Sequence, residues 1–154
     1  TTIKVSNPER VVLLTQTTLS VDDTRELVGV LRGRFPHLVV RNDICYATSN
    51  RQLAAKALAG KVDVVLVIGA RNSSNCNRLR EVVEDAGVRA YLVNGPEEVT
   101  AQQLDGARRV GIVSGASTPE SLVERVVKKL APEVVIPVEV VEENVVFALP
   151  QDLR

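Results

Sequence analysis

Residues 62–68, VDVVLVI, decide the fold, and the polar run after them, residues 69–75 (GARNSSN), marks a candidate site. The first run is apolar at almost every position and ends at a glycine, which is typical of a strand buried in a parallel sheet. Residues 75–86 have the pattern of a helix closed by Gly87. A buried strand, a polar loop and a helix therefore follow one another here.

The same unit repeats on both sides of this stretch. The pattern predicts strands at residues 10–15, 38–40, 88–93 and 109–113, and helices at residues 21–35, from Thr48 or Ser49 to Leu58, at residues 97–104, and from Pro119 to Leu130. Repeated strand–loop–helix units predict the α/β class, with small parallel sheets flanked by helices. Residues 134–149 alternate in polarity, which predicts a β-rich C-terminal tail.

We place the domain boundary near residues 41–43. Residues 1–42 are interpreted as a partial α/β domain, residues 43–131 as a complete one, and residues 132–154 as the tail. An incomplete first domain would leave apolar surface uncovered, which predicts a partner or marginal stability.

Composition narrows the class of protein. Aromatic residues make up only 3% of the chain, so the core must be aliphatic. Nineteen basic and nineteen acidic residues balance, which argues against a nucleic-acid partner. No apolar run approaches the roughly 20 residues of a membrane span. Two cysteines make neither a disulfide framework nor a four-thiolate site, and the composition predicts a cytoplasmic protein.

Polar clusters fall where ligands bind in open α/β sheets, beyond the carboxyl ends of strands. The four clusters are Thr15–Thr18 (TQTT), Cys45–Thr48 (CYAT), Gly69–Asn75 (GARNSSN) and Ser114–Pro119 (SGASTP). Hydroxyl groups, a carboxamide and free N–H groups at helix N-termini form a site for an anion. Since the chain has neither of the common glycine-rich nucleotide motifs, we expect a small phosphorylated ligand held by neutral donors.

Each cluster also has a purely structural interpretation. Ser73, Ser74 and Ser117 can be ordinary helix caps, and Thr17 and Thr18 can be ordinary loop residues. Cys45 can be a small buried apolar residue, and Cys76 an inert thiol. His37 is interpreted as a solvated surface histidine. The occurrence of all four clusters in one order favours the functional interpretation.

The motifs resemble one family. They are TQTTLS at residues 15–20, DICYATSNRQ at 43–52, NSSNCNRL at 72–79 and GASTP at 115–119, with VEENVVF at 141–147 near the end. Together they resemble the LytB family, the 4-hydroxy-3-methylbut-2-enyl diphosphate reductases, and the resemblance covers nearly the whole chain. It implies the C-terminal half of a trefoil of three α/β domains around a [4Fe–4S] cluster.

The resemblance also implies roles for residues. Cys45 corresponds to the last of three cluster cysteines, Thr17 to a catalytic threonine beside the substrate hydroxyl, and Gln16 to its polar neighbour. Ser73, Ser74, Asn75 and Ser117 correspond to the residues that hold the diphosphate. The other two cysteines, two histidines and the proton-donating glutamate of the family have no counterpart here. A missing N-terminal domain or a partner chain would supply them.

The implied activity is that of an oxidoreductase of the non-mevalonate isoprenoid pathway. It would convert 4-hydroxy-3-methylbut-2-enyl diphosphate, a small allylic diphosphate, to isopentenyl and dimethylallyl diphosphates by reductive dehydroxylation. Ferredoxin or flavodoxin is the implied electron donor. We expect no reductase activity from this chain alone, because one thiolate cannot anchor the cluster. The alternative is a stand-alone, non-catalytic domain that binds a small diphosphate.

Overall fold

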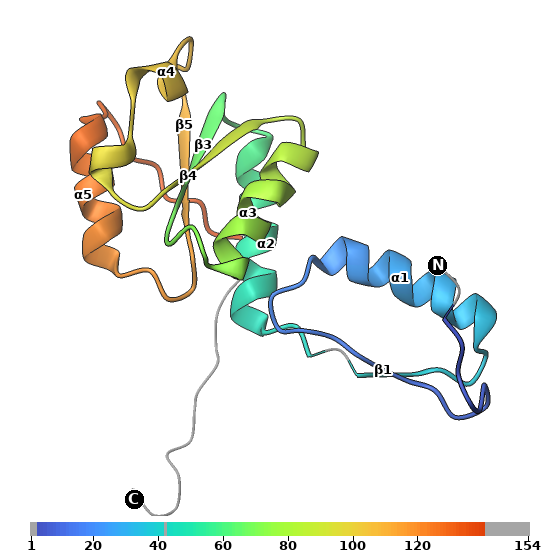
Figure 1. The fold of residues 1–154 in the computed structure, drawn as a ribbon. Helices are drawn as coiled ribbons and strands as arrows, with labels where there is room; N and C mark the ends of the chain where they lie inside the picture. Colours follow the sequence, from blue (N-terminus) through green and yellow to red (C-terminus); the bar gives the residue numbers. More distant parts are fainter. Residues whose placement is uncertain (1–2, 42, 141–154) are drawn as a thin grey trace, which may run out of the picture.

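The structure, a computed structural model, describes residues 3–41 and 43–140. It contains two parallel sheets flanked by helices, which confirms the predicted α/β class (Figure 1). The smaller sheet pairs β1 (Val12–Leu14) with β2 (Val39–Arg41). The larger sheet has the order β4–β3–β5, from β3 (Val64–Ile68), β4 (Arg89–Val93) and β5 (Val110–Ser114).

Strand β3 is the centre of the larger sheet. All five of its residues are fully buried, as the VDVVLVI run predicts. It pairs in parallel on both sides, with Val64 opposite Arg89 and Val110, and Ile68 opposite Val93 and Ser114. The carboxyl ends of the three strands are therefore level at one edge of the sheet.

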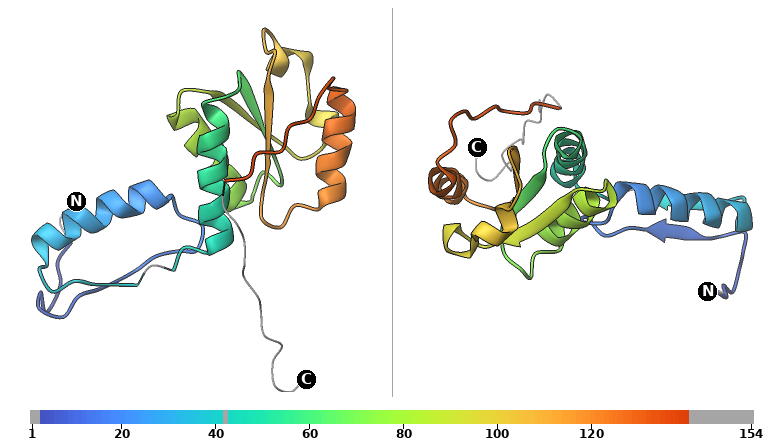
Figure 2. Two further views of the ribbon diagram at one scale, coloured as in Figure 1. Left: turned by 180° about the vertical axis from the view of Figure 1, so that it is seen from behind. Right: turned by 90° about the horizontal axis from the view of Figure 1, so that it is seen from above.

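Helices cover both faces of this sheet (Figure 2). Val65 and Val67 pack into the cluster that includes residues of α2 (Tyr46–Ala59) and α3 (Ser74–Asp85). Leu66 and Ile68 point the other way, into the cluster of α5 (Glu120–Leu130). The short elements η1 (Pro96–Glu98) and α4 (Ala101–Leu104) connect β4 to β5. The alternation of side chains along a strand thus builds two core layers from one apolar run.

The β1–α1–β2 segment lies beside the larger sheet, joined to it near the first turn of α1 (Val21–Arg34) (Figure 1). One face of its sheet is exposed, although the apolar run at residues 10–15 is typical of a buried strand: Val12 is 58% exposed, Leu14 69% and Val39 55%. The reason is that only two strands pair here and nothing among the described residues covers this face. The expected uncovered apolar surface is therefore present.

Helix α2 joins the two parts. The side chain of Gln52, only 2% exposed, donates to the Leu19 carbonyl at 2.9 Å and accepts the Val21 N–H at 3.0 Å. Asp22 pairs with Lys56 of α2, and Asp23 pairs with Arg78 of α3 at 3.4 Å. These contacts cross the boundary proposed near residues 41–43, and the division into domains stays a prediction.

Some helix starts differ from the sequence prediction. Helix α2 begins at Tyr46 with Cys45 as its N-cap, rather than at Thr48 or Ser49, because the Cys45 carbonyl already accepts the N–H groups of both residues. The predicted helix at residues 97–104 is two short pieces, since Val99 has extended backbone between them.

The tail carries no strand in residues 131–140, and the remainder of the predicted β-rich stretch lies outside the described residues. Val138 alone in this segment packs against the core, beside β5 and α2. Within residues 3–41 and 43–140, no helix combines the length and apolar character that crossing a bilayer requires.

Candidate functional site

The candidate site lies at one end of the larger sheet. Because the three strands are parallel and in register, the loops after β3, β4 and β5 emerge together. The N-termini of α2, α3 and α5 lie at this same end (Figure 1). Helix N-termini present unpaired N–H groups and partial positive charge, so this end of the sheet suits an anion.

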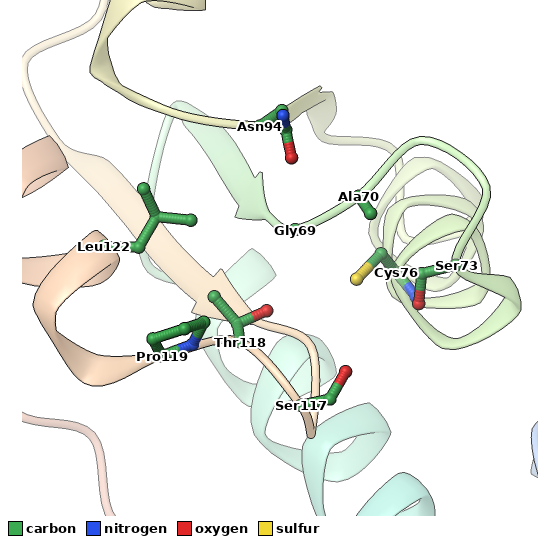
Figure 3. Close-up of a pocket in the computed structure, with 9 residues that line it drawn as sticks. All are labelled: Gly69, Ala70, Ser73, Cys76, Asn94, Ser117, Thr118, Pro119 and Leu122. Carbon is green, nitrogen blue, oxygen red and sulfur yellow. The ribbon is translucent and has the colours of Figure 1, made fainter.

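An open cavity of about 170 Å³ occupies this edge (Figure 3). It is lined by Gly69, Ala70, Ser73, Cys76, Asn94, Ser117, Thr118, Pro119 and Leu122. Ser73 and Ser117, which are 44 positions apart in the chain (117 − 73), therefore line one cavity. Among residues 3–41 and 43–140, no lysine or arginine lines it, so its hydrogen-bonding groups are neutral hydroxyls, amides and backbone groups.

The loop before α3 is held by its own side chains. Ser73 is the N-cap, and its hydroxyl accepts the Cys76 N–H at 3.3 Å, so the predicted capping role is confirmed. The Asn77 amide donates to the Arg71 carbonyl at 2.8 Å and to the Ser73 carbonyl at 3.0 Å. Ser74 opens the helix and is exposed. The loop is thus fixed without using the Ser74 side chain as a cap.

Asn75 is the most informative residue of the site. Its side chain is buried, with the residue 8% exposed, yet neither the nitrogen nor the oxygen of its amide has a hydrogen-bond partner. The amide nitrogen lies 3.7 Å from where a Cβ of Gly115 would be, so it reaches the loop after β5. Buried amides without partners are rare and cost about 1–3 kcal/mol. A bound polar ligand would remove this cost.

Asn94 follows β4 and projects its side chain toward the cavity (Figure 3). Its backbone N–H donates to Glu98 at 3.1 Å, and this bond is the main reason that the pKa of Glu98 is lowered, with Arg71 contributing. Arg71 pairs with Glu98 at 2.8 Å. Sequence reasoning missed Asn94, although an asparagine directly after a strand was a usable signal.

Ser117 is not a helix cap, so the interpretation of this residue as an ordinary cap is wrong. Helix α5 is preceded by Pro119, whose extended backbone provides the N-cap position. Ser117 is exposed in the loop between β5 and α5, where it lines the cavity. Its hydroxyl is therefore placed by the loop and not by the helix.

Cys45 and Thr17 form a second group at this end of the fold. The Cys45 N–H donates to the Thr17 carbonyl at 3.1 Å, and the Thr15 hydroxyl accepts the Asp43 N–H at 3.0 Å. Cys45 is exposed at the start of α2, so it is not a small buried core residue. Gln16 and Thr17 are exposed too. None of these three residues lines the cavity that holds Ser73 and Ser117.

The remaining candidates have structural surroundings. Cys76 is buried in the core cluster at 2% exposure, with its sulfur reaching the cavity wall. The imidazole of His37 lies 3.4 Å from Glu9, with both side chains about 70% exposed (70% and 71%), which confirms a surface histidine.

The fold and the cavity assign the chain to a class of protein: the α/β proteins with a neutral, polar cavity at the carboxyl ends of parallel strands. The model of the family described as LytB protein matches residues 1–131, and the chain belongs to this family.

Relatives and solved structures agree with this assignment. The chain is 52% identical to a 4-hydroxy-3-methylbut-2-enyl diphosphate reductase of Aromatoleum aromaticum, over 99% of this chain and 50% of that protein. It is 48% identical to the enzyme of that name in Ralstonia nicotianae, over 99% and 48%. The solved structure of the E-1-hydroxy-2-methyl-but-2-enyl-4-diphosphate reductase from Plasmodium falciparum matches with a TM-score of 0.79 and 33% identity, over 84% of this chain and 42% of that one. The chain spans about half the length of the curated relatives it matches.

Proposed function

We propose that this chain is the diphosphate-binding part of an iron–sulfur reductase that converts 4-hydroxy-3-methylbut-2-enyl diphosphate to isopentenyl and dimethylallyl diphosphates. The observation that carries the proposal is the buried, unpartnered amide of Asn75 beside a cavity lined by Ser73 and Ser117. Family membership supports the reaction class, because the relatives are reductases by name.

The site suits a diphosphate for three reasons. Hydroxyl groups reach the cavity from the loops after β3 and β5, so two phosphoryl groups can be held by two loops. The N-terminus of α3, a helix of 12 residues, adds free N–H groups and the favourable end of its dipole. The Asn75 amide can donate to a phosphoryl oxygen and end its unpaired state.

The end of the substrate that reacts is assigned to Cys45, Thr17 and Gln16. In the proposal, Cys45 ligates one iron of a [4Fe–4S] cluster, and Thr17 positions the substrate hydroxyl and relays a proton, with Gln16 as its polar neighbour. The hydrogen bond between the Cys45 and Thr17 backbones supports this pairing. A cluster, when bound, would pass the two electrons of the reduction, one at a time, from an external donor to the substrate.

The fit of the chain to a cluster is partial. Cys45 is exposed, as a ligand to an external iron must be. Within residues 3–41 and 43–140, no three His, Cys, Asp or Glu side chains gather closely enough to hold a metal ion. Two further thiolates must therefore come from residues outside this sequence, on the same polypeptide or on a partner chain. We propose ferredoxin or flavodoxin as electron donor and a cytoplasmic setting.

Calorimetric titration of the chain with isopentenyl diphosphate tests the diphosphate site. We expect Asn75→Ala and Ser117→Ala each to weaken binding by about tenfold, the effect of roughly one charge-assisted hydrogen bond. Ser6→Ala, at an exposed loop position far from the cavity in sequence, is the matched control and should bind like the unsubstituted chain. Equal affinity in all of the variants would remove the site.

Reconstitution of the cluster distinguishes the enzyme from the alternative, a stand-alone binding domain. The chain is mixed without oxygen with the preceding half of the Aromatoleum aromaticum relative, iron and sulfide, and the visible absorbance of the cluster is followed. For the reductase, Cys45→Ser abolishes the absorbance and Cys76→Ser leaves it unchanged. Diphosphate binding with no cluster in any mixture would favour the stand-alone domain.

A further inference from the structure

The carbonyl of Ile68, the last residue of β3, is a meeting point for the two loops of the site. It accepts the Gly115 N–H at 3.0 Å and the Thr118 hydroxyl at 3.0 Å. The Cys76 sulfur also approaches it, at 4.0 Å. A carbonyl oxygen has two lone pairs, and here the loop before α5 supplies both strong donors.

The gap between the two loops is filled by side-chain atoms. A Cβ added to Gly69 would lie 2.3 Å from the Cys76 sulfur, and one added to Gly115 would lie 2.4 Å from it. The Thr118 hydroxyl would lie 3.1 Å from either Cβ. The sulfur and the hydroxyl point toward one another across this gap (Figure 3). The separation of the loops is therefore set by close contact, and protein interiors tolerate little change in such contacts.

Each of these two residues directly follows a residue of the proposed diphosphate site. Cys76 follows Asn75 in the first turn of α3, and Thr118 follows Ser117 before α5. In each pair, the first residue is assigned to the diphosphate site, while the second lines the cavity and lies against the Ile68 carbonyl. A shift of the second residue would move the first, because the backbone between them is short and fixed.

We propose that Thr118 and Cys76 are positioning residues that hold the two phosphate-binding loops at the spacing of a pyrophosphate. The proposal rests on the diphosphate site proposed above and adds the basis of its selectivity. Orthophosphate is small enough for one loop to bind, whereas pyrophosphate must contact both. Loosening the loops therefore weakens the binding of pyrophosphate more than the binding of orthophosphate.

The test compares inorganic pyrophosphate with orthophosphate by calorimetry in Thr118→Val and Thr118→Ser. Valine keeps the shape of threonine and removes the hydroxyl, while serine keeps the hydroxyl. We expect Thr118→Val to weaken the binding of pyrophosphate by about fivefold, which is the effect of one lost hydrogen bond. The affinity for orthophosphate should change by less than about twofold. Thr118→Ser should restore the ratio of the two affinities. Equal weakening of both anions, or no rescue by serine, would overturn the proposal.

Two outcomes distinguish this proposal from the one it rests on. If the unsubstituted chain binds no pyrophosphate, the diphosphate site itself is wrong and the positioning role falls with it. If the unsubstituted chain binds pyrophosphate and the affinity ratio is the same in Thr118→Val, only the positioning role is wrong.

Amide exchange followed by NMR gives a readout without ligand. The Thr118 hydroxyl holds the loop that places the Gly115 N–H on the Ile68 carbonyl. Thr118→Val should therefore speed the exchange of the Gly115 N–H and leave the exchange of the Leu66 N–H, in the middle of β3, unchanged. Thr118→Ser should keep the original rate at Gly115. Equal acceleration at Gly115 and Leu66 would indicate a general loss of stability and would contradict the proposal.

Discussion

At Gly115, alanine is excluded by neighbouring atoms rather than by the backbone. Its φ is not in the left-handed region, whereas the φ of Gly69 is +155°. The Cβ of an alanine at Gly115 would meet the Cys76 sulfur at 2.4 Å. The restriction at this residue is therefore relieved if the sulfur is removed.

We expect Gly115→Ala to lower the free energy of unfolding by about 1–3 kcal/mol, as overpacking of a well-packed core does. In Gly115→Ala/Cys76→Ala the loss should be smaller than the sum of the two single losses, by at least about 0.5 kcal/mol. Urea unfolding followed by circular dichroism measures the free energies of unfolding of the two single variants and the double variant. Gly33→Ala, with nothing within 4 Å of the new Cβ, is the control and should not destabilise. Strict additivity would show that the sulfur is not the obstacle.

The carboxylate of Asp63 is bound to the backbone just before β5. It accepts the backbone N–H groups of Arg109 at 2.8 Å and Arg108 at 2.9 Å. These two bonds lower the pKa of Asp63 below its ordinary value of 3.8. The ionised form is therefore favoured by folding, and the stability that it contributes is lost as the pH falls through the lowered pKa.

For this reason Asp63→Asn should lower the urea midpoint at neutral pH. The difference from the unsubstituted chain should persist down to about pH 4 and shrink below it, since the unsubstituted chain then loses the same charge. Urea midpoints measured from pH 7 to pH 2 check this. Glu124→Gln removes one exposed negative charge elsewhere and should leave the urea midpoint at neutral pH nearly unchanged.

At the scale of elements, the N-terminus of α1 is capped from two sides. The Ser20 hydroxyl accepts the Asp23 N–H at 3.2 Å, and Gln52 of α2 accepts the Val21 N–H. The same Gln52 amide donates to the Leu19 carbonyl. One buried side chain thus satisfies two backbone groups of a loop 31–33 residues away in sequence.

Gln52→Leu should therefore lower the free energy of unfolding by about 1–3 kcal/mol, because leucine fills the space but leaves two backbone groups unpaired. Thermal unfolding by calorimetry measures the loss. Gln102→Leu makes the same replacement on the exposed surface of α4 and should have little effect. A similar loss in both variants would mean that the buried bonds are not the cause.

Much of this architecture was predictable from local sequence. The run at residues 64–68 identifies β3 because every one of its side chains is aliphatic. Ser73, a strong N-cap, lies within two residues of the predicted start of α3 at residue 75. The start of α2 was missed because cysteine at the N-cap leaves no signal, while Thr48 and Ser49 nearby do. Uncovered apolar surface was expected in the first domain, but its place on β1 and β2 was not, because it depends on how many strands pair, which an apolar run does not reveal.

The candidate site divides in the same way. Ser73 and Ser117 precede helices, and Ser74 and Asn75 lie in the first turn of α3. Their place at the carboxyl end of the sheet therefore follows from the strand–loop–helix pattern. Asn94, Cys76 and Thr118 were not assigned to the site because their contribution depends on neighbours from other loops. The order β4–β3–β5, which brings those loops together, could not be read from the chain.

At the scale of the whole molecule, the uncovered face of the β1–β2 sheet is an apolar surface outside the core. Val12, Leu14 and Val39 are each more than half exposed. An exposed apolar face on a short two-stranded sheet is typical of an interaction surface. Under the proposed function, this face packs against residues outside this sequence, on the same polypeptide or on a partner chain.

Val12→Thr/Leu14→Thr should reduce the binding of a fluorescent apolar dye and the self-association seen by sedimentation velocity, because threonine keeps the strand propensity while lowering hydrophobicity. Leu53→Thr, 47% exposed on α2, is the control for a single exposed leucine and should change neither by as much. An unchanged dye signal in the double variant would show that this face is covered.

The two acidic residues that open α1 tie its first turn to the rest of the molecule through ion pairs with Lys56 and Arg78. Concentrated salt weakens such exposed pairs, since the screening length falls to about 3 Å at 1 M, while the aliphatic layers around β3 are untouched by screening. Heating in molar sodium chloride should then split a single calorimetric peak into two, with the small β1–α1–β2 unit melting first.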